Sequence, residues 1–192
     1  MLQQNPQVMR YVADNRSESE IRETFDSRLH PWSPGASHWL CLVVRDAQNT
    51  ALGVTGYIHR EADCAEVGFL FAPEAQGQGY GSESLRAVCD YAFREGGIRR
   101  LTATVTAGNV ASRRTLEKIG FRLEGELRES YSLAGEWHND WLLAYLAMSM
   151  ISHRHPADSR YQGILLHSAL RFLRIKDVTF FPYAQPTRIG FY

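Results

Sequence analysis

Residues 65–94 read AEVGFLFAPEAQGQGYGSESLRAVCDYAFR and join a strand, a glycine-rich loop and a helix. Apolar side chains alternate over residues 65–71, which is typical of a β-strand. Over residues 82–94 they recur at helical spacing and predict an amphipathic helix. The loop Gln76–Gly81 therefore delivers the chain to a helix N-terminus, where free N–H groups and the helix dipole favour anionic phosphates.

This loop matches neither of two common nucleotide-binding motifs. A Walker loop requires G-K-[ST], but no lysine precedes Lys118. A dinucleotide fingerprint requires G-x-G-x-x-G, whereas the glycines here are Gly77, Gly79 and Gly81. Because glycine has no Cβ atom, a pyrophosphate could approach the main chain closely at these three positions.

The flanking sequence predicts an α/β domain in the order helix, three strands, helix, strand, helix, two strands. Capping-box spacing at Ser17–Glu20 begins the first helix, over about residues 18–28. Asn109 can cap the short third helix, which ends at Gly120. The first two strands and the last two read as antiparallel hairpins, the latter around the turn Ala134–Gly135. The predicted strands are 39–45, 51–59, 65–71, 100–105, 121–129 and 140–147.

Length and composition fit one globular domain with an unusual tail. The chain has 192 residues, 44% hydrophobic and 22% charged, and its formal net charge is zero. Six Lys/Arg against two acids make the segment from Ser152 onward basic, and that segment is also rich in aromatic residues. We therefore divide the chain into a main domain, 1–151, and a basic aromatic C-terminal extension, 152–192. Neutral bulk charge argues against a nucleic-acid binder.

The sequence also predicts a cytoplasmic protein without a metal. Cys41, Cys64 and Cys89 are far apart, which fits reduced thiols better than a disulfide framework or a zinc site. His153 and His155 are too few ligands for a metal. Neither an export signal nor a membrane span is visible, so we expect no membrane partner.

Several motifs in the same order resemble the GNAT superfamily of N-acetyltransferases. Gln76–Gly81 is similar to its [QR]-x-x-G-x-[GA] motif, and Asn109-x-x-Ser112 with Lys118–Phe121 is similar to its next segment. Glu124–Arg128, Gly135–Trp137 and Asp140 resemble the RimJ/RimL branch, which acetylates N-terminal amines of ribosomal proteins and other primary amines; Asn5–Tyr11 resembles that branch's first helix. Together these motifs cover about residues 5–148.

The resemblance implies a splayed, mixed, mostly antiparallel sheet flanked by helices, with coenzyme A between the two central strands. Acetyl-CoA would be the co-substrate, no metal would be needed, and the acetyl group would pass directly from thioester to amine in a ternary complex. The implied coenzyme A contacts are Leu70, Phe71 and Ala72 for pantetheine, Gln76, Gly77, Gln78, Gly79, Tyr80, Gly81 and Ser82 for pyrophosphate, and Asn109 and Ser112 near the thiol.

Direct attack needs a neutral amine and a place for the charge of the departing thiolate. Glu66, on the strand before the loop, is one candidate base, and its alternative role is an ion pair with an arginine. Glu129 is the second candidate base, against a solvated surface charge. Ser112 could hydrogen-bond the thiolate, or it could only support the Asn109 cap. Many members of the family have a tyrosine acid where this chain has Leu116.

The sequence does not identify the amine that accepts the acetyl group. Tyr131, Trp137 and His138 are expected to border its pocket, against the alternatives of packing or exposure. A protein N-terminus, a polyamine and an aminoglycoside-like amine are all possible acceptors. Two other readings of the chain are a non-catalytic acyl-CoA-binding module and an RNA-associated factor that uses the basic tail.

The resemblance to this branch implies that its first strand is missing before Asn5, which would leave the neighbouring strand with an open edge. Part of the extension, either Gly163–Arg171 or Asp177–Tyr183, is expected to add a replacement strand. It could do so within the molecule or in a partner, and the latter would give a homodimer. Over Gly163–Ile175, a helix and a strand followed by a helix remain open.

Overall fold

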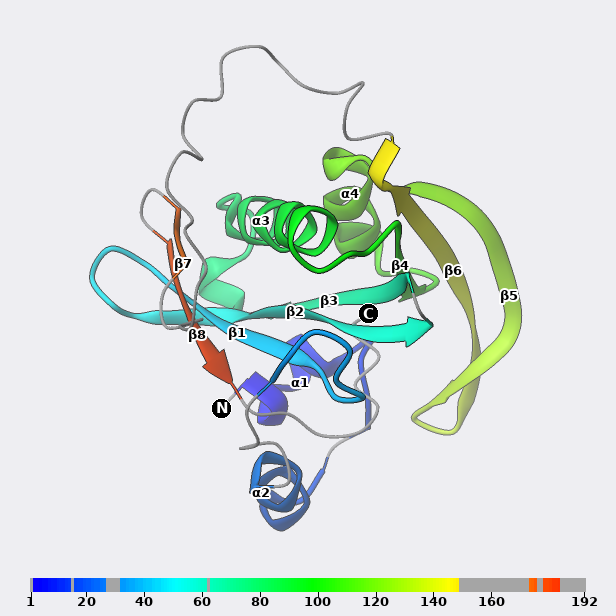
Figure 1. Ribbon diagram of the computed structural model, residues 1–192. Helices are drawn as coiled ribbons and strands as arrows, with labels where there is room; N and C mark the ends of the chain where they lie inside the picture. Colours follow the sequence, from blue (N-terminus) through cyan, green and yellow to red (C-terminus); the bar gives the residue numbers. More distant parts are fainter. Residues whose placement is uncertain are drawn as a thin grey trace.

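The computed structural model describes residues 2–14, 16–26, 32–61, 63–148, 173–175 and 178–183. Helices cover both faces of one eight-stranded sheet of order β5-β6-β4-β3-β2-β1-β8-β7 (Figure 1). The helical elements are η1 (Leu2–Gln4), α1 (Pro6–Met9), α2 (Glu18–Asp26), η2 (Pro73–Ala75), α3 (Tyr80–Arg94) and α4 (Val110–Ile119). The strands are β1 (Leu40–Arg45), β2 (Ala51–Glu61), β3 (Cys64–Phe71), β4 (Arg100–Thr106), β5 (Arg122–Leu133), β6 (Glu136–Leu146), β7 (Leu173–Ile175) and β8 (Val178–Tyr183).

The predicted α/β class and the order of elements are confirmed, with two boundary corrections. Helix α3 begins at Tyr80, directly after its N-cap Gly79. Strands β5 and β6 both extend to the turn at Ala134–Gly135, so the predicted ends at Glu129 and Asp140 were wrong. The distal part of this hairpin is largely exposed, and its polar residues therefore have no alternation that indicates a strand.

The centre of the sheet opens between β3 and β4. These two strands are parallel and pair only from Cys64↔Arg100 to Glu66↔Thr102. Beyond Glu66, β3 continues beside β2, and β4 continues beside β6 as far as Thr106↔Asp140. The other pairings among the described strands are antiparallel, so the sheet splays at the one parallel pair that these strands make.

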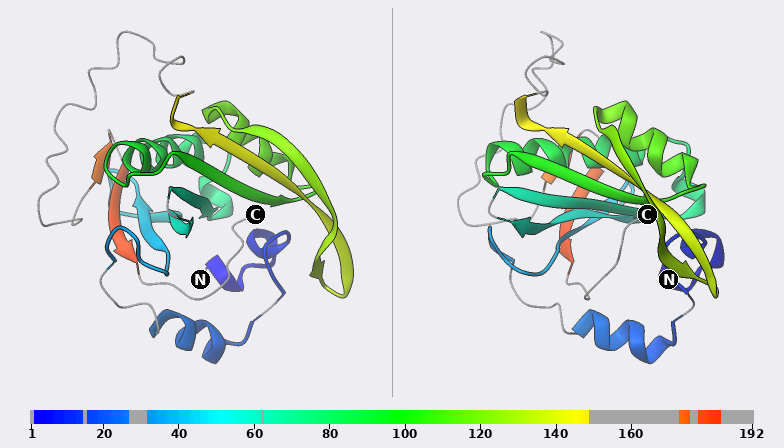
Figure 2. Two further views of the ribbon diagram at one scale, coloured as in Figure 1. Left: turned by 45° about the vertical axis from the view of Figure 1, so that its right-hand side comes forward. Right: turned by 90° about the vertical axis from the view of Figure 1, so that its right-hand side faces the viewer.

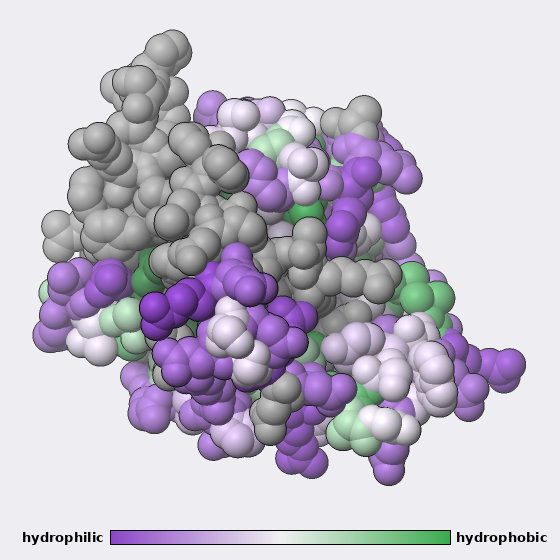
Figure 3. Space-filling view, turned by 90° about the horizontal axis from the view of Figure 1, so that it is seen from below, coloured by the Kyte–Doolittle hydropathy of each residue, from purple (hydrophilic) through white to green (hydrophobic). Residues whose placement is uncertain are grey.

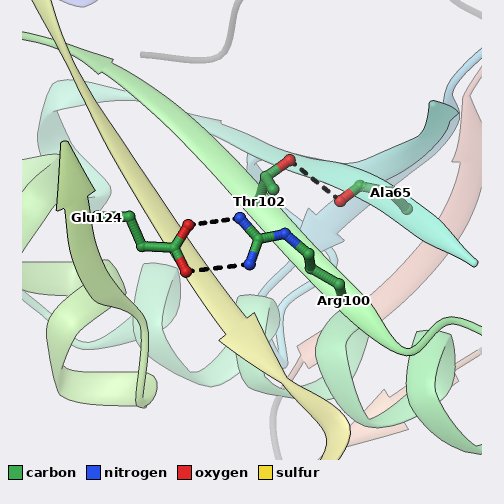
Figure 4. A network of polar contacts seen from close by, with 4 residues as sticks. All are labelled: Ala65, Arg100, Thr102 and Glu124. Carbon is green, nitrogen blue, oxygen red and sulfur yellow. Dashed lines mark hydrogen bonds and ion pairs between the residues drawn. The ribbon is translucent and has the colours of Figure 1, made fainter. Parts of the chain in front are cut away.

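Polar contacts tie the strands together at the closed end of this gap (Figure 4). The Thr102 hydroxyl lies 3.4 Å from the Ala65 carbonyl oxygen across β3 and β4. Arg100 on β4 makes a two-pronged ion pair with Glu124 on β5, and one of its two bonds, Nη1 to Oε1, is 3.0 Å long. Because β6 lies between these two strands, this pair spans three strands of the sheet.

The two faces of the sheet carry separate apolar clusters. Helices α3 and α4 cover one face, and α1 and α2 lie on the other (Figures 1 and 2). The apolar stripe of α3 enters the main core, where Leu85 and Val88 are 0% and 1% exposed; each contributes about 2 kcal/mol of burial. The smaller cluster on the other face consists of Val8, Met9, Val12, Trp39, Ile58 and Leu70. The surface on this side is mostly hydrophilic (Figure 3).

Strand β8 covers the outer edge of β1. The two strands are antiparallel, from Cys41↔Tyr183 to Arg45↔Thr179, and β7 pairs with β8 in turn. The expectation that Asp177–Tyr183 adds a strand is confirmed for Val178–Tyr183. The other candidate, Gly163–Arg171, lies outside the described residues, as do most of Gly163–Ile175.

Deletion of residues 152–192 should lower stability, because the backbone groups on the outer edge of β1 would lose their partners. We expect a lower melting temperature and some association through the bared edge. Thermal unfolding and light scattering of the shortened and full chains check this. An unchanged melting temperature together with an unchanged oligomeric state would contradict the role of β8.

A histidine on β2 anchors the loop that precedes β1. The Nε2 atom of His59 accepts a hydrogen bond of 3.1 Å from the backbone N–H of Gly35. Its ring stacks on Trp32 and meets Tyr57 edge-on. Burial lowers the pKa of His59 below its ordinary value of 6.5. The neutral ring is therefore the form that the folded chain prefers, and only that form can accept the bond from Gly35.

This predicts a loss of stability in mild acid. Above about pH 6.5 the contribution of His59 is fully present, and it declines as the pH falls toward the lowered pKa of the folded chain. Urea unfolding between pH 7.5 and 5 measures the slope. In His59→Phe, which keeps an aromatic ring, the slope should be reduced; an identical slope in both proteins would show that another group causes it.

Candidate active site

A cavity of about 450 Å³ lies where β3 and β4 separate. Four segments line it: the first helix with the turn after it, the end of β3, the glycine loop with the start of α3, and α4. Its lining residues are Gln7, Val8, Arg10, Tyr11, Phe69, Leu70, Phe71, Ala75, Gln76, Gly77, Gly79, Gly81, Ser82, Asn109, Ala111, Ser112, Arg114, Thr115 and Lys118. Its volume is within the ordinary range of small-molecule sites.

The glycine loop forms one end of the cavity. Gly77 and Gly79 have φ angles of +75° and +91°, and a Cβ atom at either would meet no other atom within 4 Å. Glycine is therefore required there for backbone conformation, and its missing side chain leaves the cavity open. Gly79 is the N-cap of α3 and offers no side-chain hydrogen bond to the first turn. The exposed N–H groups of this 15-residue helix are thus available to an anion.

The last residues of β3 form the wall beside the gap. The Ala72 N–H donates to the Leu52 carbonyl on β2, and alternate residues of a strand direct their backbone groups to opposite edges. The backbone groups of Phe69 and Phe71 therefore face the gap, where the Gln76 side chain donates to the Phe71 carbonyl over 3.1 Å. Of the predicted segment Leu70–Ala72, it is Phe71 that can offer backbone groups to a ligand.

Helix α4 forms the opposite wall. The Oδ1 atom of Asn109 accepts from the Ser112 N–H over 3.2 Å, so the predicted cap is confirmed. Both residues line the cavity, and Ser112 is nearly buried. Leu116 is 1% exposed and belongs to the main core, so it presents no polar group to the cavity.

The cavity has a strong positive bias. Among the described residues, its lining includes Arg10, Arg114 and Lys118 but no aspartate or glutamate. Together with the N-terminus of α3, these cations favour a ligand that carries several negative charges. The residues present therefore fit the phosphates of coenzyme A.

Most of the predicted coenzyme A residues line the cavity, whereas Ala72, Gln78 and Tyr80 do not. The prediction missed Gln7, Arg10, Tyr11, Phe69, Arg114 and Lys118. For Arg114 and Lys118 a signal existed, since spacings of three and four residues place them on one face of α4 with Ala111 and Thr115. The first segment reaches the cavity only through tertiary packing, and its local sequence does not indicate this.

Neither predicted base lies in the cavity. The Glu66 carboxylate pairs with Arg60, with Oε2 2.7 Å from Nε. It shares a strand face with Leu70, which lines the cavity, but four residues of strand span about 13 Å. Whether Glu66 takes the amine proton directly or through water stays open. Glu129 is exposed and has a φ of 47°. Both assignments stay predictions.

The residues expected at the acceptor pocket lie on the β5–β6 hairpin and outside the cavity lining. Trp137 is 65% exposed, and His138 faces Tyr131 across the two strands. The Tyr131 hydroxyl donates to the Val12 carbonyl over 2.8 Å. Tyr131 thus contacts the segment that lines the cavity, and substrate contact by these three residues stays a prediction.

None of the described helices is long and apolar enough to cross a membrane. Within the same residues, no group of three or more His, Cys, Asp or Glu side chains is arranged to hold a metal ion.

The splayed sheet, the glycine loop and the cationic cavity define an α/β domain whose cavity at the end of β3 fits a phosphate-bearing ligand. The model of the acetyltransferase (GNAT) domain matches residues 1–122, and the chain belongs to this family. Among solved structures, a GNAT-family acetyltransferase from Bacillus anthracis superposes with a TM-score of 0.66 at 26% identity, covering 77% of this chain and 86% of that one.

A spermidine N-acetyltransferase from Vibrio cholerae, solved with CoA and spermine, has the same fold, with a TM-score of 0.68 at 24% identity over 78% of this chain and 88% of that one. In sequence, the chain is 36% identical to the uncharacterized N-acetyltransferase YnaD of Bacillus subtilis over 42% of its length, and the match spans 48% of that relative. It is 25% identical to the spermidine N(1)-acetyltransferase of Escherichia coli over 84% of this chain and 83% of that relative.

The cationic face of α4 should contribute to coenzyme A binding. We expect Arg114→Gln and Lys118→Met each to weaken it about fivefold, the effect of roughly 1 kcal/mol from a partly screened charge. Isothermal titration calorimetry with coenzyme A at low and high salt measures this effect, which should shrink as salt rises.

Arg113→Gln is the matched control. Arg113 is on the same helix but points away, with its guanidinium 4.8 Å from the Trp141 ring centroid and its Nε bonded to Glu117. Equal losses in all three variants would mean that α4 acts only through net charge.

Proposed function

We propose that this protein is an acetyl-CoA-dependent N-acetyltransferase that moves the acetyl group directly from the thioester to a primary amine. The observation that carries the proposal is the cavity bounded by the end of β3, the glycine loop and α4, which extends from the N-terminus of α3 to Asn109 and Ser112 and is also lined by the first segment of the chain. Both substrates can then be bound together, as direct transfer in a ternary complex requires.

The proposed binding mode assigns a part of the coenzyme to each segment. The N–H groups of the glycine loop and α3 would hold the pyrophosphate, aided by the nearby cations. The backbone of Phe69 and Phe71 would pair with the pantetheine amides. Asn109 and Ser112 would lie near the thiol, where a hydroxyl can stabilise the departing sulfur.

The cavity also limits the choice of acceptor. A polyamine is a multiple cation and would be favoured by carboxylates, and none of the described residues that line the cavity carries one. Arg10 lies on the side of the first segment, where the acceptor would enter. We therefore favour the N-terminal amine of a peptide over a polyamine or an aminoglycoside, although relatives include proteins named spermidine N(1)-acetyltransferase.

An acetyl-CoA consumption screen tests the proposed function and the choice of acceptor together. We expect turnover with some peptides that have a free N-terminus and less with spermidine or an aminoglycoside; the same peptides with blocked N-termini are the control. A melting temperature that coenzyme A leaves unchanged would contradict the coenzyme site itself. If turnover is highest with spermidine, the proposed acetyltransferase activity stands and the assignment of a peptide N-terminus as the acceptor is overturned.

A second candidate is an acyl-CoA-binding module without catalysis, which the absence of a carboxylate from the cavity lining favours. It predicts coenzyme A binding without turnover of any amine. Glu66→Gln and Glu129→Gln refine the choice, with Arg60→Gln as the control for the ion pair. If Glu66 acts as the base through water, only its own variant loses turnover; if the ion pair alone matters, Arg60→Gln and Glu66→Gln behave alike.

A further inference from the structure

Acetyl transfer from a thioester leaves a sulfur that must receive a proton, and few groups at this cavity can supply one. The hydroxyl-bearing residues of its lining are Tyr11, Ser82, Ser112 and Thr115. Ser82 is in the first turn of α3, at the phosphate end. The Thr115 hydroxyl is engaged with the Ala111 carbonyl over 2.9 Å. Among the hydroxyl groups of the lining, Ser112 and Tyr11 are therefore the two candidates for the proton donor.

Tyr11 lies against the turn that leads into α4. A Cβ atom at Gly108 would be 3.5 Å from the Tyr11 ring and 3.8 Å from its hydroxyl oxygen. Gly108 directly precedes Asn109, and its φ is +102°. The phenol is therefore next to the residues that mark the proposed thiol end of the cavity.

The backbone around Tyr11 is held from two sides. Its neighbour Val12 is 3% exposed in the smaller apolar cluster. The Val12 carbonyl accepts the hydrogen bond from Tyr131, and the Asp14 carboxylate accepts a bond of 2.6 Å from the Ala134 N–H at the tip of the hairpin. A helix of four residues such as α1 has little stability alone, so these contacts determine where Tyr11 lies.

The hairpin is itself shaped for this contact. Between Leu127 and Tyr131 the register of β5 and β6 shifts, so the chain bulges before it reaches Tyr131. The Ser130 hydroxyl lies 2.8 Å from Asp140 Oδ2, and the Glu129 N–H donates to Asn139 over 2.9 Å. These bonds fix the bulge and thereby the direction of Tyr131.

We infer that Tyr11 is the proton donor to the departing sulfur and that Tyr131 is a positioning residue that holds it there; the inference rests on the proposed acetyl transfer. In the reaction, the amine nitrogen forms a bond to the acetyl carbon, the carbon–sulfur bond breaks, and its electron pair stays on sulfur. Sulfur takes the phenol proton. The amide nitrogen releases one proton to water, and the phenolate recovers one from water.

Acidity separates the two candidates. A phenol ionises near about pH 10 and a thiol near about 8.5, so proton transfer between them is nearly balanced. A serine hydroxyl is a far weaker acid. Ser112 can therefore donate a hydrogen bond to the sulfur but cannot readily give up its proton, whereas Tyr11 can do both.

The test is Tyr11→Phe, measured with the best amine from the screen. We expect kcat to fall about 100-fold, the usual scale of general acid catalysis, with KM for acetyl-CoA unchanged. A wild-type kcat in Tyr11→Phe overturns the inference while the proposed function stands; no turnover by the wild-type protein with any amine contradicts the proposed function itself.

Tyr131→Phe removes the hydrogen bond to Val12 and should lower kcat by less. Its effect should vanish in the double variant with Tyr11→Phe, because a positioning residue has nothing to position once the phenol is gone. Tyr91→Phe is the matched control, since Tyr91 packs against the main core on α3, outside the cavity lining. Additive losses in the double variant would show that Tyr131 acts independently of Tyr11.

A second measurement does not depend on turnover. With all tyrosines labelled at Cζ with carbon-13, the Tyr11 signal is assigned by its loss in Tyr11→Phe. It should shift when coenzyme A is added, whereas the Tyr91 signal should stay. Coenzyme A should still raise the melting temperature of Tyr11→Phe, which shows that the cavity is intact. If the Tyr11 signal does not shift when coenzyme A binds, the phenol lies away from the thiol and the inference is overturned.

Discussion

The site depends on a short pairing between two strands. β3 and β4 share three residue pairs, and each is then held by its other neighbour, β3 by β2 and β4 by β6. If pairing continued past Glu66, the two strands would satisfy each other's backbone groups and close the gap. Because it stops, the edge of β3 at Phe69 and Phe71 keeps polar groups for a ligand in the middle of a sheet. Thr102 and the Arg100–Glu124 pair secure the closed end.

The gap also determines where the charges of the site come from. The chain leaves β3 through the glycine loop, crosses in α3 and returns in β4, so the N-terminus of α3 lies at the open end of the gap. Helix α4 follows β4 directly and brings Arg114 and Lys118 to the other wall. Positive potential thus follows from the connectivity of the strands as well as from the choice of side chains.

A feature of the fold or the site could be predicted from the sequence where neighbouring residues indicate it, and could not where it depends on contacts between distant residues. The strand, loop and helix of residues 65–94 were read directly, because alternation, helical spacing and glycine positions are properties of neighbouring residues. The Asn109 cap was predicted for the same reason. The ion pair of Glu66 with Arg60 was the alternative reading of Glu66, and only the register of β2 and β3 brings Arg60 within reach. Tyr11 and Tyr131 are 120 positions apart in the chain, and no local pattern relates them.

The absence of a carboxylate among the described residues that line the cavity affects the protonation of an attacking amine. An amine attacks only in its neutral form, and a nearby carboxylate would stabilise the ammonium and keep it protonated. A cavity lined by Arg10, Arg114 and Lys118 has the opposite effect, because like charges favour loss of the proton to solvent. In the proposed reaction, the same cations would stabilise the negative charge that collects on the thioester as its bond to sulfur breaks. A positive cavity is therefore consistent with amine acetylation, and it leaves the departing sulfur as the place where a protein group is most needed.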